Sequence, residues 1–202
     1  MAEDILQQLP AQLADDHDNN FLNPEQFAEL ACNEIEYYRN QDSNFSAGVE
    51  VRDDITGIFV SKGNLLNGRD ARVPRLRVAA TLAHEIGTHV LTYYNGQQQP
   101  LREFYTGMAG YEPLQEGLAV LAEYLVGGLS RARLRLLAGR VIAVQSIFQG
   151  ADFIETFYVL YKQYHFSKAT AFNIAMRVYR GGGLYLRRCF FTRLHEPFFL
   201  SR

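Results

Sequence analysis

The stretch Ala83-His84-Glu85-Ile86-Gly87-Thr88-His89 decides the fold, together with Leu114-Gln115-Glu116-Gly117-Leu118-Ala119 further along the chain. Two imidazoles on one apolar segment and a carboxylate on another are the side chains from which catalytic zinc sites are built. We therefore expect His84, His89 and Glu116 to bind one Zn2+ per chain, with a fourth position left for water.

The two histidines are five residues apart, whereas those of the familiar zinc-peptidase helix motif are four apart. At roughly 100° per residue, five residues leave the side chains about 140° apart on a regular helix. Both histidines reach one ion only if the helix takes in an extra residue, most simply as a single π-bulge, which is found mostly at functional sites. We predict an irregular turn between Glu85 and His89, eased by Gly87.

Glu85 follows the first predicted ligand directly. It is the expected general base, which takes a proton from the zinc-bound water. A purely structural site has no need of a base beside its ligand, so Glu85 favours an enzyme. A polar trio packed and hydrogen-bonded without metal is the plainer alternative, although burying charged groups without partners is costly.

These motifs resemble those of a known family. The pattern His84-Glu85-x-x-x-His89, residues 88–96 and residues 115–119 are similar to the microtubule-associated tyrosine carboxypeptidases, and more so to their bacterial relatives, the flavohaemoglobin expression-modulating QEGLA-motif proteins. The resemblance covers about residues 57 to 183. It implies an α+β, mainly α-helical, gluzincin-like zinc metallopeptidase domain with a small N-terminal β-sheet or hairpin.

The resemblance also implies an activity and a substrate class. It predicts a zinc metallocarboxypeptidase that acts at the C-terminus of a peptide or protein, on tyrosine or another aromatic residue. In the eukaryotic branch the residue removed is the C-terminal tyrosine of α-tubulin. The bacterial family name supports a second interpretation, a zinc-containing regulatory or binding protein with little or no hydrolysis.

Composition limits the other possibilities. The chain has 202 residues, 48% of them hydrophobic, a formal net charge of −2 and two cysteines. This is enough for one well-filled core, offers no basic footprint for nucleic acid and makes no disulfide framework. We expect a cytoplasmic protein with no signal peptide and no membrane segment. Oligomeric state is left open.

Three regions are expected along the chain. Residues 1–20 are polar and acidic and are predicted to be a solvated segment, residues 21–183 form a single metallopeptidase-like domain, and residues 184–202 form an atypical C-terminal tail. The tail departs from the family, in which the glycines are followed by a Thr-Lys-Asp segment and a longer helical region. We expect this tail to reflect either a truncation or a change in sequence relative to the family.

Helices are predicted from Asn23, from Pro74 to Gly96, from Glu112 to Gly127, and over residues 131–148, 153–164 and 167–180. Within residues 131–148 one apolar face is expected, made of Leu134, Leu137, Val141 and Val144, and the arginines are expected on a solvated face. Residues 49–51 and 55–60 are β-rich and predict a hairpin or small sheet. By analogy with zinc peptidases, residues 55–61 are the candidate edge strand for a substrate backbone, and a sheet that only covers the core is the alternative.

The roles of other side chains follow from less specific signals in the sequence. Glu123 is expected to pair with Arg77, while Ala119 and Val120 stand where a carboxylate would orient a ligand histidine, so that partner is not identified.

A carboxypeptidase needs a cation for the substrate carboxylate, and Arg177 and Arg180 are the candidates. Tyr161, His165 and Tyr179 are candidate donors to the oxyanion. Each of these residues is, taken alone, more often structural.

Overall fold

The structure is a computed structural model that describes residues 1–9 and 20–180. The chain divides into two compact units. The sheet unit is residues 17–129, and the helical unit is residues 1–16 with residues 130–202. The single domain predicted over residues 21–183 includes parts of both units and stays a prediction. The predicted tail, residues 184–202, lies outside the described residues.

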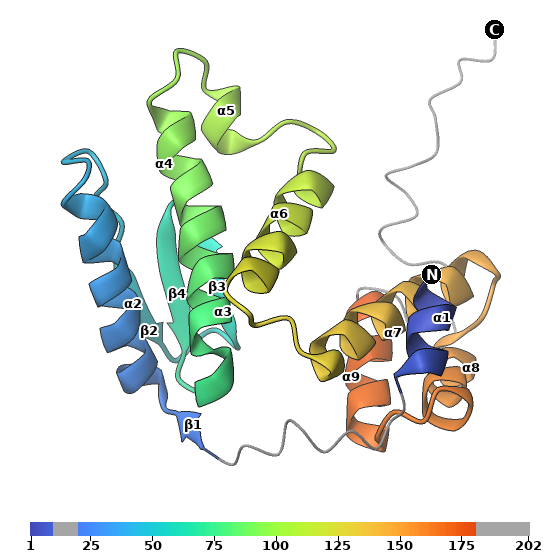
Figure 1. The fold of residues 1–202 in the computed structure, drawn as a ribbon. Helices are drawn as coiled ribbons and strands as arrows, with labels where there is room; N and C mark the ends of the chain where they lie inside the picture. The colour runs from blue at the N-terminus through green and yellow to red at the C-terminus, as the bar shows by residue number, and fades with distance from the viewer. Residues whose placement is uncertain (10–19, 181–202) are drawn as a thin grey trace, which may run out of the picture. The chain divides into compact units, whose positions relative to one another are not determined.

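The sheet unit contains five short strands and a series of helices (Figure 1). In chain order its elements are β1 (Phe21–Leu22), α2 (Pro24–Arg39), β2 (Val49–Arg52), β3 (Ile58–Ser61), β4 (Asn64–Gly68), β5 (Val73–Pro74), η2 (Arg75–Arg77), α3 (Val78–His84), η3 (Glu85–Val90), α4 (Leu91–Gln97), α5 (Glu103–Thr106) and α6 (Glu112–Leu125).

Local chemistry starts α2 where the sequence predicted. The Asn23 side chain accepts a hydrogen bond from the Gln26 backbone N–H at 2.8 Å, and the Gln26 side chain accepts one from the Asn23 N–H at 3.0 Å. Pro24 occupies the first turn, where a missing N–H costs nothing. This capping box satisfies two N–H groups that the helix itself leaves without partners.

The predicted small sheet is present, but a hairpin between residues 49–51 and 55–60 is not. β3 pairs antiparallel with β4 through a turn in which Lys62 and Gly63 have positive φ. β2 pairs in parallel with the other edge of β4, which gives the order β2-β4-β3. Residues 49–51 and 55–60 therefore do not pair with each other, because β2 and β3 each pair with β4, a central strand that the sequence did not predict.

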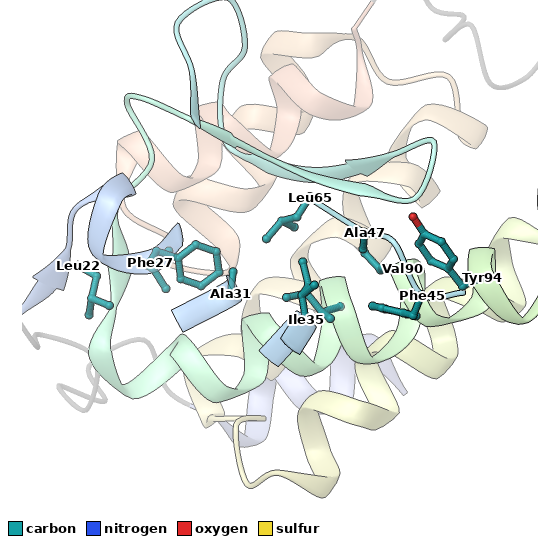
Figure 2. Close-up of a cluster of buried hydrophobic side chains, with 11 residues drawn as sticks. Leu22, Phe27, Ala31, Ile35, Phe45, Ala47, Leu65, Val90 and Tyr94 are labelled. Carbon is teal, nitrogen blue, oxygen red and sulfur yellow. The ribbon is translucent and has the colours of Figure 1, made fainter. Parts of the chain in front are cut away.

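One long helical rod, α3-η3-α4, packs with α2 against this sheet (Figure 1). Phe27, Ala31 and Ile35 of α2, Leu65 of β4 and Val90 of the rod meet in the buried core of the unit (Figure 2). The core therefore fixes one face of the rod, and the opposite face remains available for a functional site.

The helical unit consists of helices only in its described residues. They are α1 (Ala2–Gln8), α7 (Arg131–Phe148), α8 (Phe153–Tyr158), η4 (Val159–Gln163) and α9 (Lys168–Val178). α1 corrects the expectation of a solvated segment over the start of the chain, since Leu6 is buried against α7 and its neighbours. Ser167 caps α9 as predicted, accepting from the Thr170 N–H.

The buried face of α7 differs from the predicted one. Val141 and Val144 are exposed, whereas Ala138, Ile142 and the guanidinium of Arg135 are buried. Arg135 donates to the backbone carbonyls of Leu6, at 3.1 Å, and of Leu9 and Tyr164. Its charge was expected in solvent, but these carbonyls compensate it inside the unit.

The described residues contain no helix that is both long enough and apolar enough to cross a bilayer.

Replacing Arg135 with Ala should destabilise the protein by about 2–3 kcal/mol, because the variant leaves buried carbonyls without donors. Hydrogen exchange should show the loss first in α1, which Arg135 ties to α7. Arg131→Ala, an exposed arginine of the same helix, is the matched control. If the two variants had the same free energy of unfolding in denaturant, Arg135 would not be what holds α1 against α7.

Candidate metal centre

The predicted irregular turn is present. Residues 85–90 form a π-helical segment, η3, between α3 and α4. The Thr88 hydroxyl donates to the carbonyl of Ala83, five residues earlier, at 3.0 Å, so the wider turn is supported by its own side chain. A π turn carries about 4.4 residues, which brings His89 back towards His84. The imidazole centroids lie 5.0 Å apart.

The third predicted ligand approaches from α6. The Glu116 carboxylate lies with Oε2 3.8 Å from His84 Nε2 and Oε1 3.6 Å from His89 Nε2. One ligand atom from each residue falls within 4.8 Å of the others. Ligands at about 2.1 Å from a tetrahedral zinc ion are about 3.4 Å apart, so these positions need only small adjustment to bind one. Within residues 1–9 and 20–180 this is the one such group of His, Cys, Asp and Glu.

Two helix contacts hold α3 and α6 in this position. A Cβ at Gly128, just after α6, would lie 2.3 Å from Cβ of Ala80 on α3, so only glycine allows this approach. Arg77 donates to the carbonyl of Gly128 and binds the Glu123 carboxylate at 2.7 Å. Gly117, on the same helix, takes no part in this approach, because a Cβ there would meet nothing within 4 Å.

Glu123 is the partner of the ligand histidine that the sequence did not identify. Its side chain is 1% exposed, and Oε1 lies 2.8 Å from His84 Nδ1 while Oε2 binds Arg77. A carboxylate has no hydrogen to give, so the imidazole donates from Nδ1. This tautomer leaves the lone pair of Nε2 directed to Glu116, as metal ligation requires.

Burial lowers the pKa of His84, and the neighbouring His89 lowers it further, although the hydrogen bond that His84 donates to Glu123 and the charges of Glu123 and Glu116 act to raise it. The neutral imidazole is thus favoured at neutral pH, and it is the neutral form that binds metal. The donor set of two imidazoles and a carboxylate suits zinc. The two histidines are 15% and 13% exposed, whereas Glu116 is 62% exposed, so the centre opens to solvent on the α6 side.

Tyr111, just before α6, was not singled out by the sequence. Burial raises the pKa of its phenol, and the charges of Glu112 and Glu116 raise it further. Its ring lies over Gly107, where a Cβ would come within 2.6 Å of it. Tyr111 therefore keeps its proton and is a hydroxyl donor near the third ligand.

The other predicted site residues lie in the helical unit. Tyr161 is in η4 with Lys162 and Lys168 over its ring, His165 has a positive φ just after η4, and Arg177 and Arg180 lie at the end of α9. Tyr179 donates to the carbonyl of Ala151 at 2.6 Å and bonds to Thr156, so its hydroxyl has a structural role. The substrate-binding roles of the first four stay predictions.

The candidate centre is of the kind found in metal-dependent hydrolases. It consists of a His-His-Glu donor group with a glutamate beside its first histidine, and two antiparallel helices next to a small sheet carry these residues. Residues 1–192 of the chain match the family model described as microtubule-associated tyrosine carboxypeptidase. The chain belongs to the microtubule-associated tyrosine carboxypeptidase family. No curated protein and no solved structure matches it.

Replacing Glu123 with Gln should weaken zinc binding about 10- to 100-fold. The neutral amide no longer balances the positive charge of Arg77, and its NH2 group competes with the oxygen that accepts the hydrogen bond from His84. Titration against a chromophoric zinc chelator measures the effect, and imidazole 15N shifts report the His84 tautomer. Glu103→Gln makes the same charge change at an exposed position on α5 and should bind zinc as the wild type does. Unchanged affinity in the Glu123 variant would show that this contact does not orient the ligand.

Proposed function

We propose that the protein is a zinc-dependent carboxypeptidase with a gluzincin-like active site. In this proposal His84, His89 and Glu116 hold the zinc ion, and Glu85 is the general base. The observation that carries the proposal is the approach of three ligand atoms to within 4.8 Å of one another in spite of the five-residue spacing of the histidines. Membership of a family named for a carboxypeptidase supports the reaction class.

Each residue of the centre has its own role in the proposed reaction. Zinc, when bound, supplies Lewis-acid polarisation and makes water acidic near neutral pH. Glu85 accepts a proton from the attacking water and returns it to the leaving nitrogen. Glu123 keeps His84 in the ligating tautomer, and Arg77 supplies the charge that makes a buried Glu123 tolerable.

The sheet supports a position for the substrate backbone. Within the described residues β3 hydrogen-bonds to β4 alone, and it packs against η3, the segment that carries His89. We propose that the other edge of β3, over residues 58–61, binds the substrate as an added strand. Residues 55–57, which the sequence included in this strand, precede it and have no strand pairing.

The substrate would be a peptide or protein with a free C-terminus, with tyrosine or another aromatic residue as the first choice by family. Arg177 and Arg180 remain the proposed partners of its carboxylate, and Tyr161 and His165 remain candidate donors. The alternative function, a zinc-containing regulatory protein, predicts bound zinc without cleavage.

Glu85→Gln should keep zinc and lose about 10²- to 10⁴-fold in kcat, because the amide cannot accept the proton. Bound metal is measured by elemental analysis and cleavage by release of the terminal amino acid. Glu103→Gln is again the isosteric control and should retain activity. Cleavage by the Glu85 variant at the wild-type rate would overturn the assigned mechanism, whereas zinc with no cleavage in the wild type would favour the regulatory alternative.

A pair of peptide sets should define the reaction type. Peptides that end in Tyr, Phe or Ala with a free carboxylate should be cleaved, and the same peptides with amidated ends should not, since the carboxylate is the recognised group. Removing metal with a chelator should abolish cleavage, and added zinc should restore it.

Arg177→Ala combined with Arg180→Ala should raise KM for the free-acid peptides more than kcat falls, while Arg131→Ala should change neither. Cleavage of the amidated set would exclude a carboxypeptidase.

A further inference from the structure

Helix α6 ends in a glycine turn directly before the sheet unit ends at Leu129. Gly127 has a φ of +74°, and its N–H donates to the Tyr124 carbonyl at 2.9 Å. The Gly128 N–H donates to the Glu123 carbonyl at 2.8 Å. These two bonds form a Schellman motif, in which a left-handed glycine ends the helix. The chain therefore begins its path out of the sheet unit at this turn.

Arg77, the last residue of η2, binds the same turn from the other helix of the pair. One terminal nitrogen of its guanidinium donates to the Gly128 carbonyl, and the other donates to Glu123 Oε2 at 2.7 Å. We call Arg77, Glu123 and Gly128 the exit clamp. Each of the three residues is hydrogen-bonded to the other two, so a displacement of one affects both of its partners.

The exit clamp is connected to the metal centre through the second oxygen of Glu123. Glu123 Oε1 lies 2.8 Å from His84 Nδ1, and the Glu123 side chain is 1% exposed. A carboxylate buried to this degree depends on its protein partners, because removing one of them leaves charge without compensation. The orientation of a ligand histidine and the order of the turn after α6 therefore depend on one side chain.

We propose that the exit clamp couples metal binding at His84 to the order of the chain where it leaves the sheet unit. The hydrogen bond that His84 donates to Glu123 makes the imidazole a better ligand, so by reciprocity bound metal strengthens this hydrogen bond. A Glu123 carboxylate that is held more firmly restrains Arg77 and, through it, the Gly128 carbonyl. Residues 126–129 are therefore more rigid in the metal-bound protein than in the metal-free protein.

This coupling rests on the proposed function and extends it. The proposed metal ligands belong to the sheet unit, whereas Arg177 and Arg180, the proposed partners of the substrate carboxylate, belong to the helical unit. Residues 126–130 alone separate α6 from α7. A more rigid connection restricts the positions that the two arginines can take relative to the metal, and so favours binding of substrate by the metal-bound form.

Amide hydrogen exchange of the full chain, with and without saturating zinc, tests the coupling. Residues 126–129 should exchange at least about 5-fold more slowly with zinc. The turn after α7 is a matched control, because Gly150 has a φ of +88° and the Ala151 N–H donates to the Ser146 carbonyl in the same motif. Exchange there, and at residues 40–42 after α2 in the sheet unit, should not change.

Replacing Arg77 with Lys should remove the effect of zinc on residues 126–129, because an ammonium keeps the charge but lacks the planar fork that binds Glu123 and Gly128 together. The comparison is made on protein whose bound zinc is confirmed by elemental analysis and whose fold is confirmed by circular dichroism. Arg75→Lys, at an exposed arginine of the same η2 segment, is the control and should keep the full effect.

Three results would overturn the coupling. They are equal exchange at residues 126–129 with and without zinc in the wild type, an equal slowing in the control turns, and a full effect of zinc in the Arg77→Lys variant. Failure of the proposed function is recognised separately. A wild type that binds zinc and slows exchange at residues 126–129 but cleaves no peptide would support the coupling and contradict the carboxypeptidase.

Discussion

The candidate centre depends on one backbone constraint, the extra residue between His84 and His89. A regular helix would turn the second imidazole away from the first, and the donor group would not exist. The π segment over residues 85–90 removes this conflict, and it persists because its surroundings hold it. Ile86 and Val90 are fully buried against α2 and the sheet, and the Thr88 hydroxyl binds the Ala83 carbonyl. The distortion is thus fixed by the core on one face so that the other can present two imidazoles.

The second requirement is electrostatic, and Glu123 meets it. A carboxylate that is 1% exposed would be costly alone, but its two oxygens are divided between a cation and an imidazole N–H. The same residue therefore solves two problems at once. It ties Arg77 and the end of α6 to α3, and it fixes which nitrogen of His84 is available. A substitution of Glu123 would therefore affect both the packing of α3 with α6 and the ability of His84 to bind metal.

Much of the fold could be predicted from local signals. Asn23 and Ser167 cap their helices, and Pro113 lies in the first turn of α6; such starts are predictable because they depend on neighbouring residues. The irregular turn was predictable because the ligand set determines it. The strand order was not, since the parallel pairing of β2 with β4 joins segments whose sequences carry no mark of each other. Arg135 was misplaced for the same reason, because the carbonyls that bind it belong to distant segments.

At the metal centre, the sequence predicted one of the two contacts of Glu123 but not the other. If the two helices run antiparallel, the spacings of seven residues from Arg77 to His84 and from Glu116 to Glu123 predict the ion pair of Arg77 with Glu123, which is observed. What they could not indicate was that the second oxygen of Glu123 reaches His84, since this depends on the crossing distance set by Ala80 and Gly128. The face of α6 that approaches α3 carries a small residue, Ala119, and the acidic Glu123, both buried. The close approach of the two helices and the orientation of His84 therefore depend on the same face of α6.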